Sequence, residues 1–408
     1  MKLNFKILFI LFVLFPEGIY SQESRASEYI KGLAYYQNGK PDSAIEAFER
    51  SIRLDKTNED TYLYLGLSFL ELNKLDPAIE NFRKCDELKK GKASLYMAKA
   101  YARSGNLTDC LEQLDIHLHS PYKVPESKIF LDPDFEKFEE MKSWIEFWNE
   151  GNFYSGFDKV MAEADYNINN GNFIEALSII NEGLEKGYRK SALLAKRAEI
   201  YLRLDNRKLA LDDLDQAVSA DRRNAELLKI RGQVNYDLEK YSQSLEDIQA
   251  AMKYDPVDLS LYIDRARVLQ KTGDMISAQE DMNFYLDLFP GDDRALYLFA
   301  RTYMDEGLYL DALKYLNRCL KIDPYRPEYF ASRGESYFHA RTYRKADEDL
   351  GMSLDLDPEN SNAYYLKGLA NIKLGNRDHA CYCFKKAFEL GKKEAYDELG
   401  KSCPDFFK

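Results

Sequence analysis

The chain has 408 residues, of which 45% are hydrophobic and 31% charged, a balance typical of a folded globular protein. Its formal net charge of −12 disfavours non-specific nucleic-acid binding, because the phosphate backbone attracts a basic face. With only 21 glycines and 12 prolines, the chain has few of the residues on which a turn-rich all-β protein depends.

The first 21 residues differ in character from the rest of the chain. Lys2 and Lys6 begin a segment with nine consecutive apolar residues, and Ser21 precedes a candidate cleavage site at Gln22. That run is shorter than the roughly 20 residues that a membrane-spanning helix needs. We expect residues 1–21 to be a secretory signal peptide; an uncleaved N-terminal anchor is the alternative. No cysteine adjoins the cleavage site, so a lipid anchor is not expected. After cleavage no apolar run that could cross a membrane remains, so the mature protein is expected to be exported and soluble.

A period of 34 residues runs through the chain. We number the positions of each unit 1 to 34. Position 8 is small: Gly32, Gly66, Ala98, Ala164, Ala198, Gly232, Ala266, Ala300, Gly334 and Gly368. Position 20 is also small, and position 24 is large and apolar: Phe48, Phe82, Leu114, Ile180, Leu214, Ile248, Met282, Leu316, Leu350 and Phe384. Proline at position 32 closes four units: Pro256, Pro290, Pro324 and Pro358.

The spacing predicts two helices per unit. We expect them to cross where positions 8 and 20 meet, since small residues allow a close approach, with position 24 packed beside the crossing. Proline ends the second helix, because it has no N–H and clashes with the preceding turn. A single hairpin buries only one side, so neighbouring units must stack.

This pattern resembles the tetratricopeptide repeat (TPR) family, as in "GLSFL…PAIENF" at 66–82 and "ARTYMDEGLYLDALKYLNRCLKIDP" at 300–324. Two departures are the missing tryptophan of the first helix and the arginine often found at position 7 instead of leucine. The resemblance implies an all-α solenoid, a right-handed superhelix of about ten repeats with a C-terminal capping helix. The expected divisions are a three-repeat array at 25–124, a seven-repeat array at 157–394, and a capping helix and tail at 395–408.

Residues 125–156 lack the motif and contain both tryptophans, Trp144 and Trp148. Apolar residues from Phe135 to Trp148 recur at steps of three and four, which predicts one amphipathic helix. We interpret the segment as a degenerate unit that connects the two arrays. An exposed docking helix is the alternative.

No nucleotide-binding or HExxH motif occurs, and no cofactor is expected. His117 and His119 follow Cys110, which suggests a metal site only weakly, because Cys110 occupies the small position 20 and is explained by packing. We therefore predict no metal and no catalytic activity. Cys381 and Cys403 lie eleven residues either side of a turn near residue 392, so an antiparallel hairpin would place them opposite each other. An oxidising compartment would favour a disulfide there; free thiols are the alternative.

In the TPR family, first-helix positions 2, 5, 9 and 12 face a concave groove that commonly holds peptides. The resemblance therefore implies these candidate groove residues: Lys229, Gln233, Tyr236, Ile263, Arg267, Arg294, Tyr297, Arg301, Met304, Phe338 and Tyr365. Cations and aromatic rings are typical binding anchors. The hypothesis is that an extended acidic or C-terminal peptide lies across 229–304. The alternative is that these side chains are solvated and partly paired, for instance with Asp264. Some TPR proteins bind the carboxylates of chaperone tails through a set of groove residues that includes asparagines. Those asparagines are missing here, so the sequence does not support this type of recognition.

An arginine at position 7 recurs with an aspartate at position 23. The pairs are Arg197 with Asp213, Arg231 with Asp247, Arg265 with Asp281, and Arg333 with Asp349. Where position 7 is Phe299, position 23 is Tyr315. Both members change together, as the two sides of a helix–helix contact do. We interpret the pairs as structural bridges within each repeat rather than as a ligand site.

The predicted function is a non-enzymatic protein–protein interaction scaffold of the cell envelope, periplasmic or extracellular and bacterial, that binds a protein or peptide partner in the groove. The alternative is a structural subunit of an envelope assembly that oligomerises through its convex face and the 125–156 helix.

Overall fold

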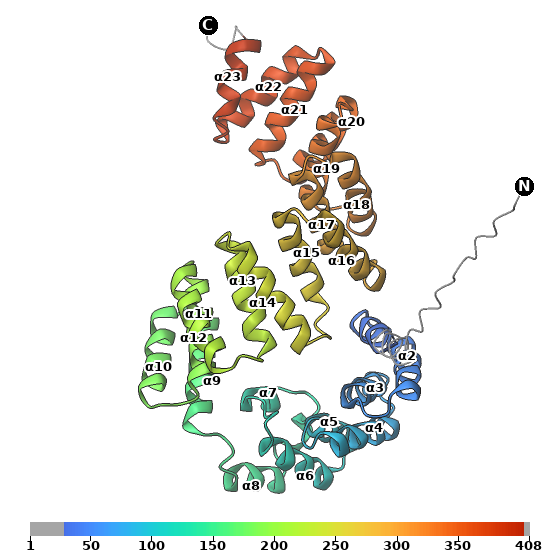
Figure 1. The fold of residues 1–408 in the computed structure, drawn as a ribbon, viewed down its shortest axis with the longest axis vertical. Helices are drawn as coiled ribbons and strands as arrows, with labels where there is room; N and C mark the ends of the chain where they lie inside the picture. The colour runs from blue at the N-terminus through green and yellow to red at the C-terminus, as the bar shows by residue number, and fades with distance from the viewer. Residues whose placement is uncertain (1–27, 404–408) are drawn as a thin grey trace, which may run out of the picture. The chain divides into compact units, whose positions relative to one another are not determined.

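Every regular element that the computed structural model describes, over residues 28–403, is a helix (Figure 1). Within each unit most successive helices contact one another, which confirms the predicted all-α solenoid. The chain divides into two units, Met1–Leu238 with Lys253–Val257 and Glu239–Met252 with Asp258–Lys408. The predicted signal peptide at 1–21 lies outside the described residues.

Unit 1 contains the helical residues 28–37 and most of the N-terminal half of the solenoid. Its further helices are α2 (Pro41–Leu54), α3 (Glu59–Glu71), α4 (Leu75–Leu88), α5 (Ser94–Ser104), α6 (Leu107–Leu118), α7 (Glu126–Phe130), η1 (Glu136–Phe138), α8 (Lys142–Glu150), α9 (Gly156–Asn169), α10 (Phe173–Glu185), α11 (Lys190–Arg203), α12 (Arg207–Ala220) and α13 (Ala225–Asp237).

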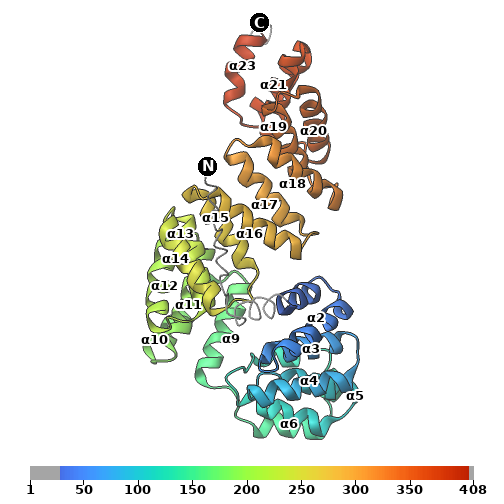
Figure 2. The same ribbon diagram turned by 45° about the vertical axis from the view of Figure 1, so that its right-hand side comes forward.

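Unit 2 continues the same architecture. Its helices are α14 (Tyr241–Tyr254), whose last two residues belong to unit 1, α15 (Ser260–Thr272), α16 (Met275–Leu288), α17 (Asp293–Asp305), α18 (Tyr309–Ile322), α19 (Pro327–His339), α20 (Tyr343–Leu356), α21 (Ser361–Leu374), α22 (Arg377–Glu389) and α23 (Glu394–Ser402). In Figure 2, α17 to α21 follow one another in chain order. α23 contacts α22 and forms the predicted cap.

Local sequence sets the turn inside each repeat. Position 15 takes a left-handed conformation, with Gly105 at φ 82° and Gly307 at φ 73°, and non-glycine residues such as Arg341 adopt it too, at φ 58°. Glycine favours this conformation because it has no Cβ. The next residue caps the second helix in several repeats, as where the Asn106 side chain accepts a hydrogen bond from the Asp109 N–H.

The helix crossing differs in one respect from the sequence prediction. A Cβ added at Gly66 would lie 2.5 Å from the Phe82 ring, and one at Gly368 would lie 2.5 Å from the Phe384 ring. Position 24 therefore occupies the space left by position 8, whereas the prediction paired position 8 with position 20 and placed position 24 beside the crossing. Phenylalanine at position 24 always accompanies glycine at position 8, because the ring needs the room that a Cβ would take.

Candidate functional site

The structure brings together three of the four predicted Arg–Asp pairs at the joint between the two helices of a repeat. Arg333 on α19 donates two hydrogen bonds to Asp349 on α20, Nε to Oδ2 at 2.7 Å and Nη2 to Oδ1 at 2.9 Å. Arg197 and Asp213 make the same two bonds at 2.7 and 2.7 Å, and Arg265 and Asp281 at 2.7 and 2.6 Å. The aspartates are buried, so each pair is a bidentate bridge inside the joint.

The remaining guanidinium nitrogen of this arginine reaches the preceding repeat. Arg333 Nη1 donates to Asn317 Oδ1 on α18 at 2.9 Å, and Arg197 Nη1 donates to Asn181 Oδ1 on α10 at 2.7 Å. Both asparagines stand at position 25. The arginine thus connects three helices from two repeats, a role for position 25 that the sequence analysis missed.

The fourth predicted pair, Arg231 with Asp247, falls on the two sides of the boundary between the units. The structure does not place the units relative to each other, so this pair stays a prediction. Within unit 1, Arg231 Nη1 donates to Asp215 Oδ1 at 3.0 Å. Asp215 also stands at position 25, so the bridge to the preceding repeat is present here too.

Repeats without the arginine use other contacts at the same place. The Phe299 and Tyr315 rings meet edge to face with centroids 6.3 Å apart. Lys367 at position 7 faces Cys383, and its Nζ instead lies 2.7 Å from Asp347 Oδ1 in the preceding repeat. In these repeats too, the residue at position 7 contacts a neighbouring helix, although the type of contact differs.

We call the residues at positions 2, 5, 9 and 12 of α15, α17 and α19 the groove face of unit 2. On α17, Arg294 and Arg301 are exposed and flank Tyr297. The Tyr297 hydroxyl lies 3.1 Å from the Ser332 hydroxyl on α19, and its ring centroid lies 4.9 Å from that of Tyr329. These contacts fix the tyrosine and leave the two guanidinium groups at the surface.

Among the described residues, the carboxylates nearest to the Arg301 guanidinium of the groove face are distant. Arg301 lies 3.9 Å from both Asp305 and Glu335, and Arg267 lies 3.9 Å from Asp264. Exposed pairs at such separations contribute little to stability, about 0–1 kcal/mol. The partial pairing agrees with the solvated alternative, and it also leaves the guanidinium groups able to exchange these neighbours for a ligand carboxylate.

Several predicted groove residues have structural neighbours instead. Met304 is only 5% exposed, so its prediction as a groove contact is wrong: the side chain packs in the core. Phe338 lies against Tyr343, with ring centroids 5.7 Å apart. The ring centroids of Tyr365 and Phe384 lie 6.0 Å apart. Tyr365 is partly buried against the apolar cluster that α22 and α23 form.

The predicted site across 229–304 is divided by the unit boundary. Lys229, Gln233 and Tyr236 lie on α13 in unit 1, whereas Ile263 and the arginines lie in unit 2. The half-buried Ile263 lies on α15. Within unit 2, α15 and α17 contact each other, so Ile263 and the arginines lie on neighbouring helices. The binding site itself stays a prediction.

The connector at 125–156 differs from the predicted single helix, because η1 and α8 are separate and Met141 is extended between them. The Phe135 and Trp144 ring centroids lie 5.7 Å apart. A continuous helix would separate residues nine apart by about 13 Å along its axis. Phe135, Phe138 and Trp144 are all buried against α5 and α6, so the connector is packed rather than an exposed docking helix.

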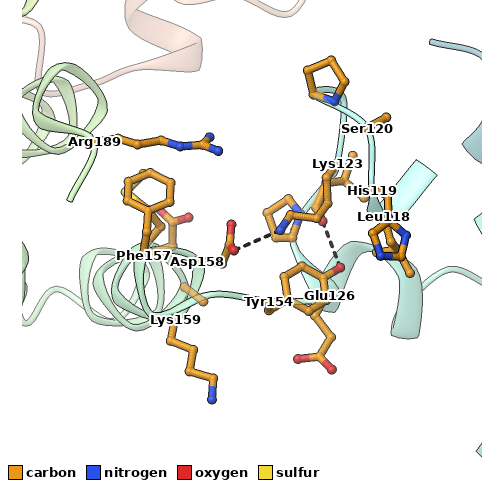
Figure 3. A pocket seen from close by; sticks show the side chains of 16 residues that line it. Leu118, His119, Ser120, Lys123, Glu126, Tyr154, Phe157, Asp158, Lys159 and Arg189 are labelled. Atoms are coloured by element: carbon orange, nitrogen blue, oxygen red, sulfur yellow. Dashed lines mark hydrogen bonds and ion pairs between the residues drawn. The ribbon is translucent and has the colours of Figure 1, made fainter. Parts of the chain in front are cut away.

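A cleft of about 440 Å³ lies beside the connector in unit 1 (Figure 3). Lys123 Nζ donates to Asp158 Oδ2 at 3.0 Å and to the Phe153 carbonyl at 2.9 Å, and Tyr154 donates to the Val124 carbonyl at 3.0 Å. The hydrogen bonds from Ser155 and Lys123 keep the pKa of Asp158 below its usual value, although burial opposes them. Lys123 and Asp158 therefore pair with each other, and the cleft is also lined by Glu126, Lys159, Asp165 and Arg189.

The histidines and cysteines have structural surroundings. His117 is buried and accepts a hydrogen bond at Nε2 from the Val124 N–H, and burial lowers its pKa to about 4. Cys381 and Cys403 are joined by a disulfide with their Cα atoms 5.8 Å apart, which fastens α22 to the end of α23. Over residues 28–403, no group of histidines, cysteines and carboxylates has the arrangement of a metal site.

Comparisons with known proteins agree with this architecture. A sequence model described as "TPR repeat" matches residues 32–73, and one described as "Tetratricopeptide repeat" matches residues 59–92, 293–326 and 361–392. The chain contains tetratricopeptide repeats.

Solved structures of other proteins are similar to this chain. A tetratricopeptide repeat protein from Parabacteroides merdae is 20% identical, with a TM-score of 0.50 over 60% of this chain and 97% of that one. The C-terminal part of a TPR protein from Cytophaga hutchinsonii is 18% identical, with a TM-score of 0.46 over 58% and 98%. Yeast Tom70 is 17% identical, with a TM-score of 0.42 over 94% and 96%. At these identities the likeness concerns the fold alone.

TPR proteins are generally non-enzymatic scaffolds, and the fold supports a protein–protein interaction role with protein or peptide partners. Among the described helices of this chain, none is long and apolar enough to cross a membrane. Glu328, Ala331 and Glu335 occupy positions 2, 5 and 9 of α19, although the groove residues predicted from the sequence included only Phe338 from this helix. The same position rule would have found them.

Proposed function

We propose that the protein is an exported, non-enzymatic scaffold whose groove face in unit 2 binds an extended acidic segment of a partner protein. The observation that supports this most directly is α17, where Arg294 and Arg301 are exposed on both sides of an immobilised Tyr297. Arginine beside an ordered ring is a typical binding anchor, because the ring limits the entropy lost on binding.

The direct test uses a fluorescein-labelled decapeptide with a central Asp-Glu pair in a Gly-Ser background. Arg267→Ala with Arg301→Ala should weaken its binding at least tenfold in fluorescence anisotropy and leave the circular dichroism spectrum unchanged. The matched control removes two exposed cations from second helices, Arg344→Ala with Lys385→Ala. An equal loss in the control, or undiminished binding by the double arginine variant, contradicts the proposal.

Export to an oxidising envelope compartment is part of this proposal. Two features support it: the signal-like residues 1–21, and the Cys381–Cys403 disulfide, since disulfides persist mainly outside the reducing cytoplasm. Mass mapping of protein from its native source should find the mature N-terminus near Gln22 and these two cysteines linked. Alkylation of all six cysteines without reductant would overturn this part.

Exposed apolar side chains at the connector favour one second candidate, a structural subunit that oligomerises there. Leu131 is 83% exposed, and Ile145 is 46% exposed on α8. Size-exclusion chromatography with light scattering distinguishes the candidates. A monomer favours the scaffold, whereas a defined oligomer that Leu131→Asp with Ile145→Asp dissociates favours the structural subunit.

A further inference from the structure

The groove face changes charge sign from one repeat to the next. On α17, positions 2 and 9 are Arg294 and Arg301. On α19, the same two positions are Glu328 and Glu335. Because α17 and α19 contact each other, a cationic row and an anionic row lie side by side on this face.

A hollow of about 190 Å³ lies along α19, with α17 on one side and α21 on the other. Tyr297 and Arg301 of α17 line one side, and Asn362, Ala363 and Leu366 of α21 line the other, with Asn360 just before α21. Between them lie Glu328, Ala331, Ser332 and Glu335 of α19 and Leu350 of α20. Position 5 is Tyr297 on α17 but Ala331 on α19, so the smaller side chain leaves the space open. The hollow has an aromatic wall, a small floor and two carboxylates at its rim.

The walls of the hollow are held in place from below. Tyr329 is buried and donates from its hydroxyl to Asp293 Oδ2 at 2.7 Å, which ties α19 to the start of α17. Tyr297 is fixed by the Ser332 hydroxyl, as described above. A preformed site loses less conformational entropy on binding than a mobile one.

The rim carboxylates are only partly neutralised. Glu328 has Arg326 at 3.5 Å, and that arginine is already held by Asp323 at 2.9 Å. Among the described residues, the cation that pairs with Glu335 is the distant Arg301, at 3.9 Å. An anionic ligand group therefore fits the Arg294 and Arg301 side, whereas a cationic group fits the hollow.

We propose that the hollow beside Ala331 receives a lysine or arginine side chain of the same extended partner whose acidic residue is bound by Arg294 and Arg301. The side chain's apolar stem packs on the Tyr297 ring, and its charged end lies between Glu328 and Glu335. This proposal rests on the proposed function, since it assigns a second element to the same bound segment.

The spacing of the helices sets the spacing in the partner. Packed helices lie 8–10 Å apart, and an extended chain advances about 3.3 Å per residue. The partner's acidic residue, bound at α17, and its basic residue, bound at α19, are then about three residues apart in the partner's sequence. The recognised segment is therefore of mixed charge, in either chain direction, rather than simply acidic.

Four fluorescein-labelled octapeptides in a Gly-Ser background test this by fluorescence anisotropy. One has Asp followed three residues later by Lys, the second has the reverse order, and the other two replace the Lys of each by Gln. We expect one Asp–Lys order to bind the wild-type protein at least tenfold more tightly than its own Gln counterpart. Equal binding of Lys and Gln peptides in both orders overturns the mixed-charge proposal and leaves the acidic site standing. No binding of any of the four overturns both.

Two variants locate the effect. Glu328→Gln with Glu335→Gln removes the charges with little change in shape, and Ala331→Leu fills the hollow. Both should abolish the advantage of the Lys peptide while the Gln peptide binds as before. If Glu328→Gln with Glu335→Gln still binds the Lys peptide more tightly than the Gln peptide by the full wild-type factor, the two glutamates do not bind the lysine. Thermal unfolding of each variant checks that the fold is retained, and the glutamine pair decides the question if Ala331→Leu unfolds.

Discussion

Two arginines on neighbouring first helices of unit 2 have opposite surroundings. Arg333 on α19 makes two hydrogen bonds at 2.7 and 2.9 Å to a buried aspartate and a third to the preceding repeat. Arg301 on α17 is exposed, and its nearest carboxylates among the described residues, Asp305 and Glu335, lie 3.9 Å away. Position in the repeat decides the difference: position 7 faces the partner helix, and position 9 belongs to the groove face. Residue type alone would have assigned both arginines the same role.

The largest expected effect follows from breaking the joint on one side. Asp349→Ala leaves Arg333 without its buried partner, which should cost about 3 kcal/mol in the stability of α19 and α20. Arg333→Leu with Asp349→Leu should recover at least half of that loss, because no charge is then left unpaired. Native-state hydrogen exchange of α19 and α20 measures both. Additive losses in the double variant would show that the pair is not coupled.

A second expected effect concerns a buried ionisable group at a recurring core position. His117 stands at position 27, where other repeats have the buried Cys85 and Cys319. Burial lowers its pKa from 6.5 to about 4, so the unfolded chain binds the proton more tightly between these values. Stability from His117 is therefore complete above about pH 6.5 and declines as the pH falls toward 4, by up to about 3 kcal/mol.

The pH effect of His117 is best measured as a difference between two proteins. Chemical denaturation at pH 7 and pH 4 is compared for wild type and His117→Gln, which keeps an acceptor near the Val124 N–H but does not titrate. The wild type should lose more stability than the variant over this range. Identical pH slopes would mean that His117 is not held neutral by burial.

A third prediction concerns packing at the joint. Gly368→Ala places a Cβ about 2.5 Å from the Phe384 ring and should cost about 2 kcal/mol, although alanine favours the helix. Adding Phe384→Leu should recover part of the loss, because the repeat with Ala98 and Leu114 already uses that combination. Thermal unfolding of the single and double variants measures this. A double variant less stable than Gly368→Ala alone would contradict the steric explanation.

The smallest expected effect is on the groove side. Arg301→Ala should change the free energy of unfolding by no more than about 0.5 kcal/mol, because its ion pairs are distant and exposed. Urea denaturation of Arg301→Ala and of Asp349→Ala measures the free energy of unfolding of both variants and so compares the groove face with the joint directly. A loss near that of Asp349→Ala would place Arg301 among the structural residues and remove the contrast.

The repeat period made much of the fold predictable. A 34-residue spacing locates the helix pairs, and covariation of positions 7 and 23 locates the joint, because both sides of a contact must change together. The covariation of Gly368 with Phe384 was also present in the sequence. This covariation indicates a steric contact between positions 8 and 24. The prediction that paired positions 8 and 20, because both are small, did not include this contact.

The rest depended on tertiary context that the period does not encode. Asn317 at position 25 has a polar side chain typical of a solvated surface, and only the neighbouring repeat makes it a partner of Arg333. Met304 follows the groove rule by position but is buried. In the connector, three aromatic residues converge on one core, so the chain gives up the continuous helix that their spacing predicts.

The most direct test of the contrast between joint and groove is one anisotropy titration of the Asp-Glu decapeptide with two double variants. We predict that Arg267→Ala with Arg301→Ala loses at least tenfold in affinity, whereas Arg333→Leu with Asp349→Leu binds like wild type once folded. Full binding by the first variant, or an equal loss in the second, would contradict the assignment of function to the groove and of structure to the joint.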